Sequence, residues 1–219
     1  MTKKKRIIQI AIDSPAAAGA GTQAKLLAKH YKLFYLDTGK IYRFIGYLKI
    51  KNKNKNLSYQ LIKKKIKDLK IKDLNKKTLL SDKVATEASI IAKDKKVRKI
   101  VYKFQIECAY NPPKKYAGSC LDGRDITSVI MKDAMFKFFI TANLKTRALR
   151  RFKELKLLKK DITVNKVLKS IKKRDKSDFN RKISPLKKTK DSVLINTTNL
   201  TKRACFLKIK KIIHGKLNN

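Results

Sequence analysis

Residues 14–22, with the sequence S-P-A-A-A-G-A-G-T, have the composition of a loop that holds a phosphate group. Small residues allow successive backbone N–H groups to face an anion, and a helix that begins there adds the positive end of its dipole. The segment is close to the pattern G-x-x-x-x-G-K-[ST], in which the final hydroxyl binds Mg²⁺. Thr22 has this final place and is the expected Mg²⁺ ligand. The residues expected to face the phosphates of a nucleotide are Ser14, Pro15, Ala16, Ala17, Ala18, Gly19, Ala20, Gly21 and Thr22.

Two positions of this loop depart from the pattern. Ala20 stands where the pattern has lysine, and Ser14 stands where it has the first glycine. That lysine reaches the β- and γ-phosphates and offsets their charge during phosphoryl transfer. Taken alone, the segment therefore also fits an ordinary turn of small residues.

The segments around the loop predict an α/β fold. Short apolar runs predict strands at residues 7–12, 33–36, 119–122, 136–140 and 193–196. Helical patterns lie between and after them, at residues 22–31, 40–51, 84–110, 144–175 (two helices with a loop near 161–163) and 201–214. This alternation predicts one domain over residues 1–219, in three layers around a mainly parallel sheet. Residues 52–85, rich in Lys, Asn and Asp, are expected to form a small inserted subdomain.

Polar clusters follow the predicted strands at residues 13–22, 37–43, 122–125 and 141–151. In open α/β sheets the ligand lies at the carboxyl ends of the strands, so these clusters are expected to share one site. Within them are the motifs L-D-T-G-K-I-Y-R at 36–43 and D-G-R-D at 122–125. Ala88-Ser89 is followed by Val97-Arg98, and R-D-x-x-D-x-N-R at 174–181 is followed by Pro185-Leu186.

In order and approximate spacing these motifs resemble those of the bacterial cytidylate kinases, over about residues 7–198. The resemblance implies the fold of P-loop nucleoside-monophosphate kinases, with a small acceptor-side insertion and a helical lid at residues 144–181. It implies transfer of the γ-phosphoryl group of ATP, with Mg²⁺, to CMP or dCMP. It favours a monomer.

The resemblance also implies roles for single residues. Those expected to read the cytosine are Thr38, Arg98 and Asp125, where a carboxylate suits the N4 amine. Those expected at the ribose are Ser89, Arg174 and Asp178, and those at the α-phosphate are Arg43, Arg124 and Arg181. The lid carries Arg147, Arg150 and Arg151, of which Arg150 is chosen, with Arg124, to offset charge on the transferred group.

Plainer interpretations remain open for several of these residues. Arg43, Arg98 and Arg124 would be solvated surface charges, as most of the 58 basic residues must be. Asp125 would be a helix N-cap. Tyr42 fits packing better than chemistry.

The chain departs from the family at two paired positions. The family has lysine at position 20 and commonly a small residue at position 40, whereas this chain has Ala20 and Lys40. We hypothesise that Lys40 supplies the missing charge and so counts among the catalytic residues. The alternatives are that Lys40 is one more exposed lysine, or that Lys25 has the role.

The composition bounds the remaining possibilities. Lys and Arg number 58 against 16 acidic residues, a formal net charge of +42. This charge fits either a polyanionic partner or a chain rich in lysine throughout. A kinase-like protein that binds nucleotide or RNA without catalysis is therefore the alternative function. No RNA-binding signature is visible, so no specific nucleic acid is expected.

The same survey predicts a cytoplasmic protein that does not enter a membrane, because no run of 18 apolar residues occurs. Three cysteines without a C-x-x-C pair favour small buried apolar residues over a zinc site or disulfides.

Overall fold

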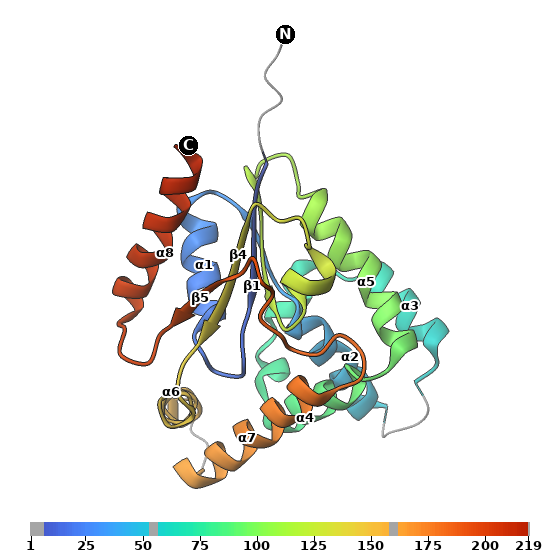
Figure 1. Ribbon diagram of the computed structural model, residues 1–219. Coiled ribbons are helices and arrows are strands. Elements are labelled where there is room, and N and C mark those ends of the chain that lie inside the picture. Colours follow the sequence, from blue (N-terminus) through green and yellow to red (C-terminus); the bar gives the residue numbers. More distant parts are fainter. Residues whose placement is uncertain (1–6, 53–56, 158–161, 219) are drawn as a thin grey trace.

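The computed structural model describes residues 7–52, 57–157 and 162–218, and its centre is a five-stranded sheet. The strands are β1 (Ile8–Asp13), β2 (Phe34–Asp37), β3 (Gly118–Gly123), β4 (Phe136–Thr141) and β5 (Val193–Asn196). Their order is β2-β3-β1-β4-β5, and every pairing is parallel (Figure 1). The predicted α/β class with a parallel sheet is confirmed.

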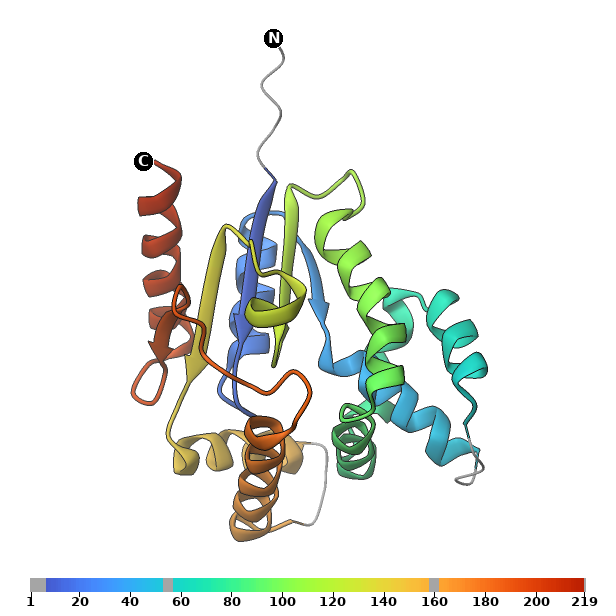
Figure 2. The ribbon, with the colours of Figure 1, turned by 45° about the vertical axis from the view of Figure 1, so that its right-hand side comes forward.

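Helices cover both faces of the sheet. On one face lie α1 (Ala20–His30) and α8 (Lys202–Leu217), and on the other lie α5 (Lys95–Tyr110) and the short π-helix η3 (Ile126–Ile130) (Figures 1 and 2). Successive residues of β1 point to opposite faces, as strand geometry requires. Ile10 and Ile12 join the core under α1 and α8, whereas Ala11 joins the core on the α5 side.

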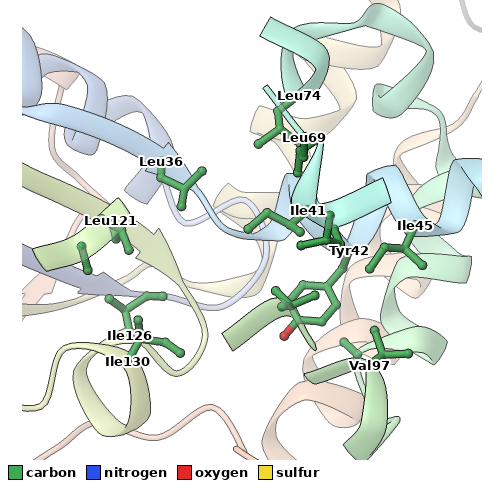
Figure 3. Close-up of a cluster of buried hydrophobic side chains, with 14 of the residues drawn as sticks. Leu36, Ile41, Tyr42, Ile45, Leu69, Leu74, Val97, Leu121, Ile126 and Ile130 are labelled. Carbon is green, nitrogen blue, oxygen red and sulfur yellow. The ribbon is translucent and has the colours of Figure 1, made fainter. Parts of the chain in front are cut away.

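The core on the α5 side extends beyond the sheet. It continues to α2 (Gly39–Lys51) and α3 (Tyr59–Lys67), where Ile41 and Ile45 pack with residues of the following segment (Figure 3). Figure 3 also shows the ring of Tyr42 inside this cluster, and its side chain is only 7% exposed. The expectation that Tyr42 serves packing agrees with this position.

The predicted single helix over residues 84–110 is wrong. The segment forms two helices, α4 (Asp82–Ile91) and α5, and each has its own N-cap. Ser81 accepts from the Val84 N–H at 3.2 Å, and Asp94 accepts from Lys96 and Val97 at 2.8 and 3.1 Å. A carboxylate that satisfies the first amides of a helix starts a new one, even within a run of good helix formers.

The expected insertion contains no strand within its described residues, 57–85. It consists of α3, the 3₁₀ turns η1 (Ile71–Asn75) and η2 (Lys77–Leu80), and the start of α4. Ile62, Ile66 and Leu74 are buried in the core that α2 and α5 share. The segment therefore packs on the body of the domain through the same core.

The expected lid contains two helices, α6 (Leu144–Leu157) and α7 (Val164–Asn180), as predicted. The predicted loop begins at Asp161, which lies outside the described residues. The two helices cross the carboxyl ends of the strands (Figure 1). Ala148, Leu155, Val167 and Ile171 form a small core with Ala16 of the glycine-containing loop.

Two further sequence expectations concern cysteines and membranes. Cys120 and Cys205 are buried free thiols, and Cys108 is a half-buried one. Within the described ranges, no helix is both long enough and apolar enough to span a lipid bilayer.

Candidate active site

A cavity of about 780 Å³ opens at the carboxyl ends of the strands, between the sheet, α2, α4 and the two lid helices. Its volume lies in the range of small-ligand sites. Every residue that the sequence proposed for donor, acceptor or metal binding lines it, from residues 14–22 to Arg181. One site therefore collects residues that are up to 167 positions apart, from Ser14 to Arg181.

The small-residue loop forms the wall beside β1 and has the shape of a phosphate cradle. Gly19 has φ 95°, a left-handed conformation that glycine adopts without strain, and α1 begins at Ala20 directly after it. The Ser14 N–H donates to Gly123 O at 3.2 Å, which ties the loop to the end of β3. Ala20 is 4% exposed, so its methyl group supplies packing where a charge was expected.

Asp13, the last residue of β1, fixes the start of the loop at residues 14–22. Its buried carboxylate accepts from the Ile126 and Thr127 N–H groups, both at 2.8 Å, and from the Thr127 hydroxyl at 2.7 Å. Burial raises its pKa to about 6, although these three hydrogen bonds oppose the rise. The contact joins the end of β1 to η3, and so orients Asp125 just before η3.

Asp125 lies in an ion-pair network at one end of the cavity. Its carboxylate pairs with the Arg98 guanidinium, and Arg181 Nη2 lies 3.7 Å from its second oxygen. Arg98 also lies over the Tyr42 ring, 5.5 Å from its centre. Asp125 stands at the N-cap position of η3, as the plainer interpretation had it, but its side chain makes no cap hydrogen bond there. Nearby, the Thr38 hydroxyl donates to Asp122 O at 2.9 Å.

Arginines gather in the middle of the cavity, where Arg43, Arg124, Arg151 and Arg174 approach one another. Arg124 Nε donates to Asp178 at 2.8 Å, and Arg43 donates to Leu79 O at 2.8 Å. The Arg174 Nε atom is buried without a hydrogen-bond partner among the described residues. Burial, then the charges of Arg124 and Arg43, lower the pKa of Arg174 to about 10. Such a cluster has excess positive charge and suits a phosphate group.

This grouping differs from the sequence expectation in one respect. Arg181 was expected at the α-phosphate and Arg174 at the ribose. The structure brings Arg181 to the Arg98–Asp125 pair and Arg174 to the arginine cluster. Ser89 is half-buried on the same wall as Asp178.

Comparisons with known proteins agree with this arrangement. Residues 10–215 match the protein family described as cytidylate kinase. The chain belongs to the cytidylate kinase family. A cytidylate kinase of Clostridium botulinum is 38% identical over 216 residues, covering 94% of this chain and 97% of that protein. One of Thermosipho melanesiensis is 40% identical over 219 residues, covering 95% and 97%.

A solved structure supports the fold alone. The crystal structure of an uncharacterized protein from Eubacterium ventriosum superposes with a TM-score of 0.56 at 18% identity, covering 94% of this chain and 98% of that one. Together with the five-stranded parallel sheet, this agrees with the P-loop kinase fold of the family.

The lid arginines of this cytidylate kinase family member have separate positions. Arg147 is buried and donates to Ala16 O at 3.0 Å and to Asp175 at 2.5 Å. Arg150 donates to Thr197 through two nitrogens, at 2.9 and 2.7 Å, and lies against Gly19. Arg151 pairs with Asp82 at 3.2 Å. Arg147 therefore anchors the lid to the loop, whereas Arg150 and Arg151 line the cavity.

No role was predicted from the sequence for two residues of the site, Asp122 and Thr197. Asp122 is the last residue but one of β3, inside the D-G-R-D motif, and its Oδ1 atom is buried without a hydrogen-bond partner in the described chain. Burial, then the charge of Asp37, raise its pKa. Thr197 follows β5 and donates to Ala18 O at 3.0 Å. Both lie at the carboxyl end of a strand, which is the signal that could have found them.

Thr22 and Asp122 both line the cavity, and their side-chain oxygen atoms could hold Mg²⁺. Oxygen ligands suit this ion, and an unpartnered buried carboxylate oxygen fits a role as ligand to the ion or its water. No group of three or more His, Cys, Asp or Glu side chains near enough to share a metal occurs in the part of the chain that the structure describes. Mg²⁺ would therefore need oxygens from the nucleotide as well, which is its usual manner of binding in kinases.

Proposed function

We propose that this protein transfers the γ-phosphoryl group of ATP to CMP or dCMP, giving CDP or dCDP. The observation that carries the proposal is the Arg98–Asp125 pair in the same cavity as the small-residue loop. The pair suits a cytosine and the loop suits the phosphates of a donor. The matched relatives are cytidylate kinases by name, over nearly the whole chain.

Recognition of cytosine follows from the chemistry of the pair. A carboxylate accepts a hydrogen bond from the N4 amine, and a guanidinium donates to the carbonyl oxygen or ring nitrogen. Uracil has a carbonyl in place of the amine and would face the Asp125 carboxylate with a second acceptor. Thr38 is close to this end through its bond to Asp122 O.

The rest of the acceptor lies toward the arginine cluster in this proposal. Asp178 and Ser89 accept from or donate to the ribose hydroxyls. The guanidinium groups of Arg43, Arg124 and Arg174 hold the α-phosphate, because planar forks match its oxygens. Arg181 keeps Asp125 in place and closes the base end.

The donor phosphates lie on the loop from Ser14 to Thr22 and the start of α1. Bound Mg²⁺, held by Thr22 and by Asp122 directly or through water, would supply positive charge to the phosphate oxygens. The protein's part is to align donor and acceptor and to stabilise charge, with no covalent intermediate on the chain. The lid helices exclude water, which limits hydrolysis of ATP. Arg150 and Arg124 offset charge on the transferred group.

We further propose a monomer in the cytoplasm, where both nucleotides are available. The test of the function is CDP formation from ATP and CMP with Mg²⁺, with UMP and AMP as parallel acceptors. Turnover selective for CMP is expected. CMP binding without any turnover would instead favour a kinase-like binding protein.

A further inference from the structure

The phosphate loop lacks its lysine, although the rest of the cradle is present. Ala20 is packed against Ala18, Ala24 and the strands of the core under α1. In a P-loop the lysine ammonium at this place stabilises charge on the β- and γ-phosphates. Removing one such charge-stabilising group costs about 10²–10³ in turnover. A family member that works must therefore supply a cation from elsewhere.

Lys40 lies at the junction of β2 and α2, two strands away from the phosphate loop. It stands in the first turn of α2, directly after β2, and its N–H donates to Asp37 Oδ1 at 3.3 Å. The order β2-β3-β1 puts only β3 between this junction and the phosphate loop, which follows β1. Neighbouring strands are about 4.8 Å apart, so the two junctions are separated by about 10 Å. A lysine side chain that extends into the shared cavity covers much of this separation.

Asp122 connects the two junctions. A Cβ atom on Gly21 would lie 3.5 Å from Asp122 Oδ2, so this carboxylate touches the first turn of α1. Asp122 pairs in register with Asp37 across β2 and β3, beside Lys40. Burial lowers the pKa of Lys40, and the charges of Asp37 and Asp122 partly oppose this. Lys40 is half-buried, and its ammonium lies in the electrostatic field of the carboxylate that borders the phosphate loop.

The other candidates for the role have other partners or positions. Arg150 is held by the hydroxyl and the carbonyl of Thr197. Lys25 is exposed on the second turn of α1, with its Nζ atom 6.0 Å from the centre of the Tyr35 ring. The Lys40 Nζ atom donates to Asn75 Oδ1 at 3.0 Å, a neutral acceptor that a phosphate oxygen can replace. A half-buried charge also acts more strongly on a phosphate than an exposed one.

We propose that Lys40 replaces the loop lysine: its ammonium binds the β- and γ-phosphates of ATP from the second strand–helix junction. This assignment rests on the proposed kinase function and names the cation for it. It predicts that positions 20 and 40 are interchangeable, so that one lysine at either position is enough.

The test is a double-mutant cycle in the full-length protein. Lys40→Ala is expected to lower kcat by about 10²–10³ with ATP and CMP, while CMP affinity and thermal unfolding stay near wild type. Adding Ala20→Lys to Lys40→Ala is expected to raise kcat at least tenfold above that of Lys40→Ala alone. A structural role of Lys40 would not be rescued by a lysine on another element.

A matched control is available on the same helix. Lys49 pairs with Glu87 at 2.6 Å and does not line the cavity, so Lys49→Ala should leave kcat unchanged. Undiminished turnover of Lys40→Ala, in a wild type that makes CDP, would overturn the assignment and leave the function intact. Loss of turnover in Lys25→Ala but not in Lys40→Ala would give the role to Lys25 and equally overturn it. If the Ala20→Lys chain does not fold, the kcat and CMP affinity of Lys40→Ala alone decide.

Discussion

At the level of the single residue, Asp125 is a counter-ion for two arginines, and we propose that it is also the acceptor for the base. Its carboxylate is 5% exposed and lies within 4 Å of both Arg98 and Arg181. Two guanidinium groups hold such a carboxylate in one orientation before any ligand arrives. Pre-oriented partners lower the entropy that binding would otherwise cost.

Asp125→Asn therefore tests the base selectivity. The amide keeps the shape of the side chain but can donate to the uracil carbonyl, so the preference for CMP over UMP should shrink. One well-formed base contact contributes about 1–3 kcal/mol of discrimination, roughly 5- to 150-fold. The measurement is the ratio of kcat/KM for CMP and UMP, with thermal unfolding as a control of folding. An unchanged ratio would remove Asp125 from base recognition.

Arg174 separates phosphate binding from base binding. Burial first, and then the charges of Arg124 and Arg43, lower its pKa, so its charge in the cluster is unfavourable until an anion enters. Arg174→Met should weaken CMP binding by about 10- to 100-fold, since a hydrogen bond to a charged group contributes about 1.5–3 kcal/mol. Affinity for cytidine, which has no phosphate, should hardly change. Calorimetric titration with both ligands checks this, and equal losses for both would place Arg174 at the nucleoside instead.

Arg98→Met is the matched variant for this comparison. It removes a guanidinium of the same size at the base end and should weaken both ligands alike. Both variants remove one positive charge, so a difference between their effects on CMP and cytidine reports where each guanidinium binds and not the change in net charge.

At the residue scale, sequence motifs predicted the members of the site but not their partners. Motifs such as D-G-R-D follow strand ends, and the parallel sheet brings these ends to one edge, so the candidates gather as expected. Which arginine faces which carboxylate depends on the packing of α7 against α4 and α6. Nothing in the spacing of Arg174 and Arg181 states that one reaches Arg124 and the other Asp125.

At the scale of the element, Asp13 joins β1 to η3 and so sets the distance between the phosphate loop and the base end. A carboxylate that is buried on a strand and accepts three hydrogen bonds fixes both segments. The raised pKa means that burial disfavours the ionised carboxylate more than these hydrogen bonds favour it. The contact therefore serves to position β1 and η3 more than to stabilise the fold.

A pH series on Asp13→Asn tests that balance. The folded protein holds the Asp13 proton to a pKa of about 6, against 3.8 in the unfolded chain, so the folded state binds more protons in this interval. Stability from this group is therefore complete below pH 3.8 and falls as the pH rises to 6. The unfolding free energy of wild type relative to the variant should fall by up to about 3 kcal/mol over the interval. Urea unfolding at several pH values measures it, and a constant difference would contradict the raised pKa.

The elements themselves were largely predictable. Short apolar runs marked all five strands, because buried parallel strands are apolar on both faces. The break between α4 and α5 was missed, since Asp94 lies among residues that favour helix on both sides. The break matters for function: it places Ser89 near the end of one helix and Arg98 in the first turn of the next, both on the cavity wall.

At the scale of the whole molecule, the sequence predicted the fold class and the ligand edge, and left the meaning of the charge open. The lid, the insertion and the sheet share cores that sequence periodicity cannot assign to one another. Residue Ala16 illustrates this, because it packs with α6 and α7 although 131 positions separate it from Arg147. Such contacts depend on tertiary packing and have no local signal.

The net charge of +42 gives a prediction for the whole molecule. Both substrates are anions, and the cavity wall carries many of the basic side chains, so long-range attraction should speed their capture. At 0.1 M salt the Debye length is about 10 Å, and added salt screens this attraction. Raising KCl from about 0.05 to 0.5 M should lower kcat/KM for CMP on the order of tenfold, mainly through KM. The affinity for uncharged cytidine should stay nearly constant over the same series. If CMP and cytidine responded alike, the charge would act on folding or solubility and contribute nothing to substrate capture.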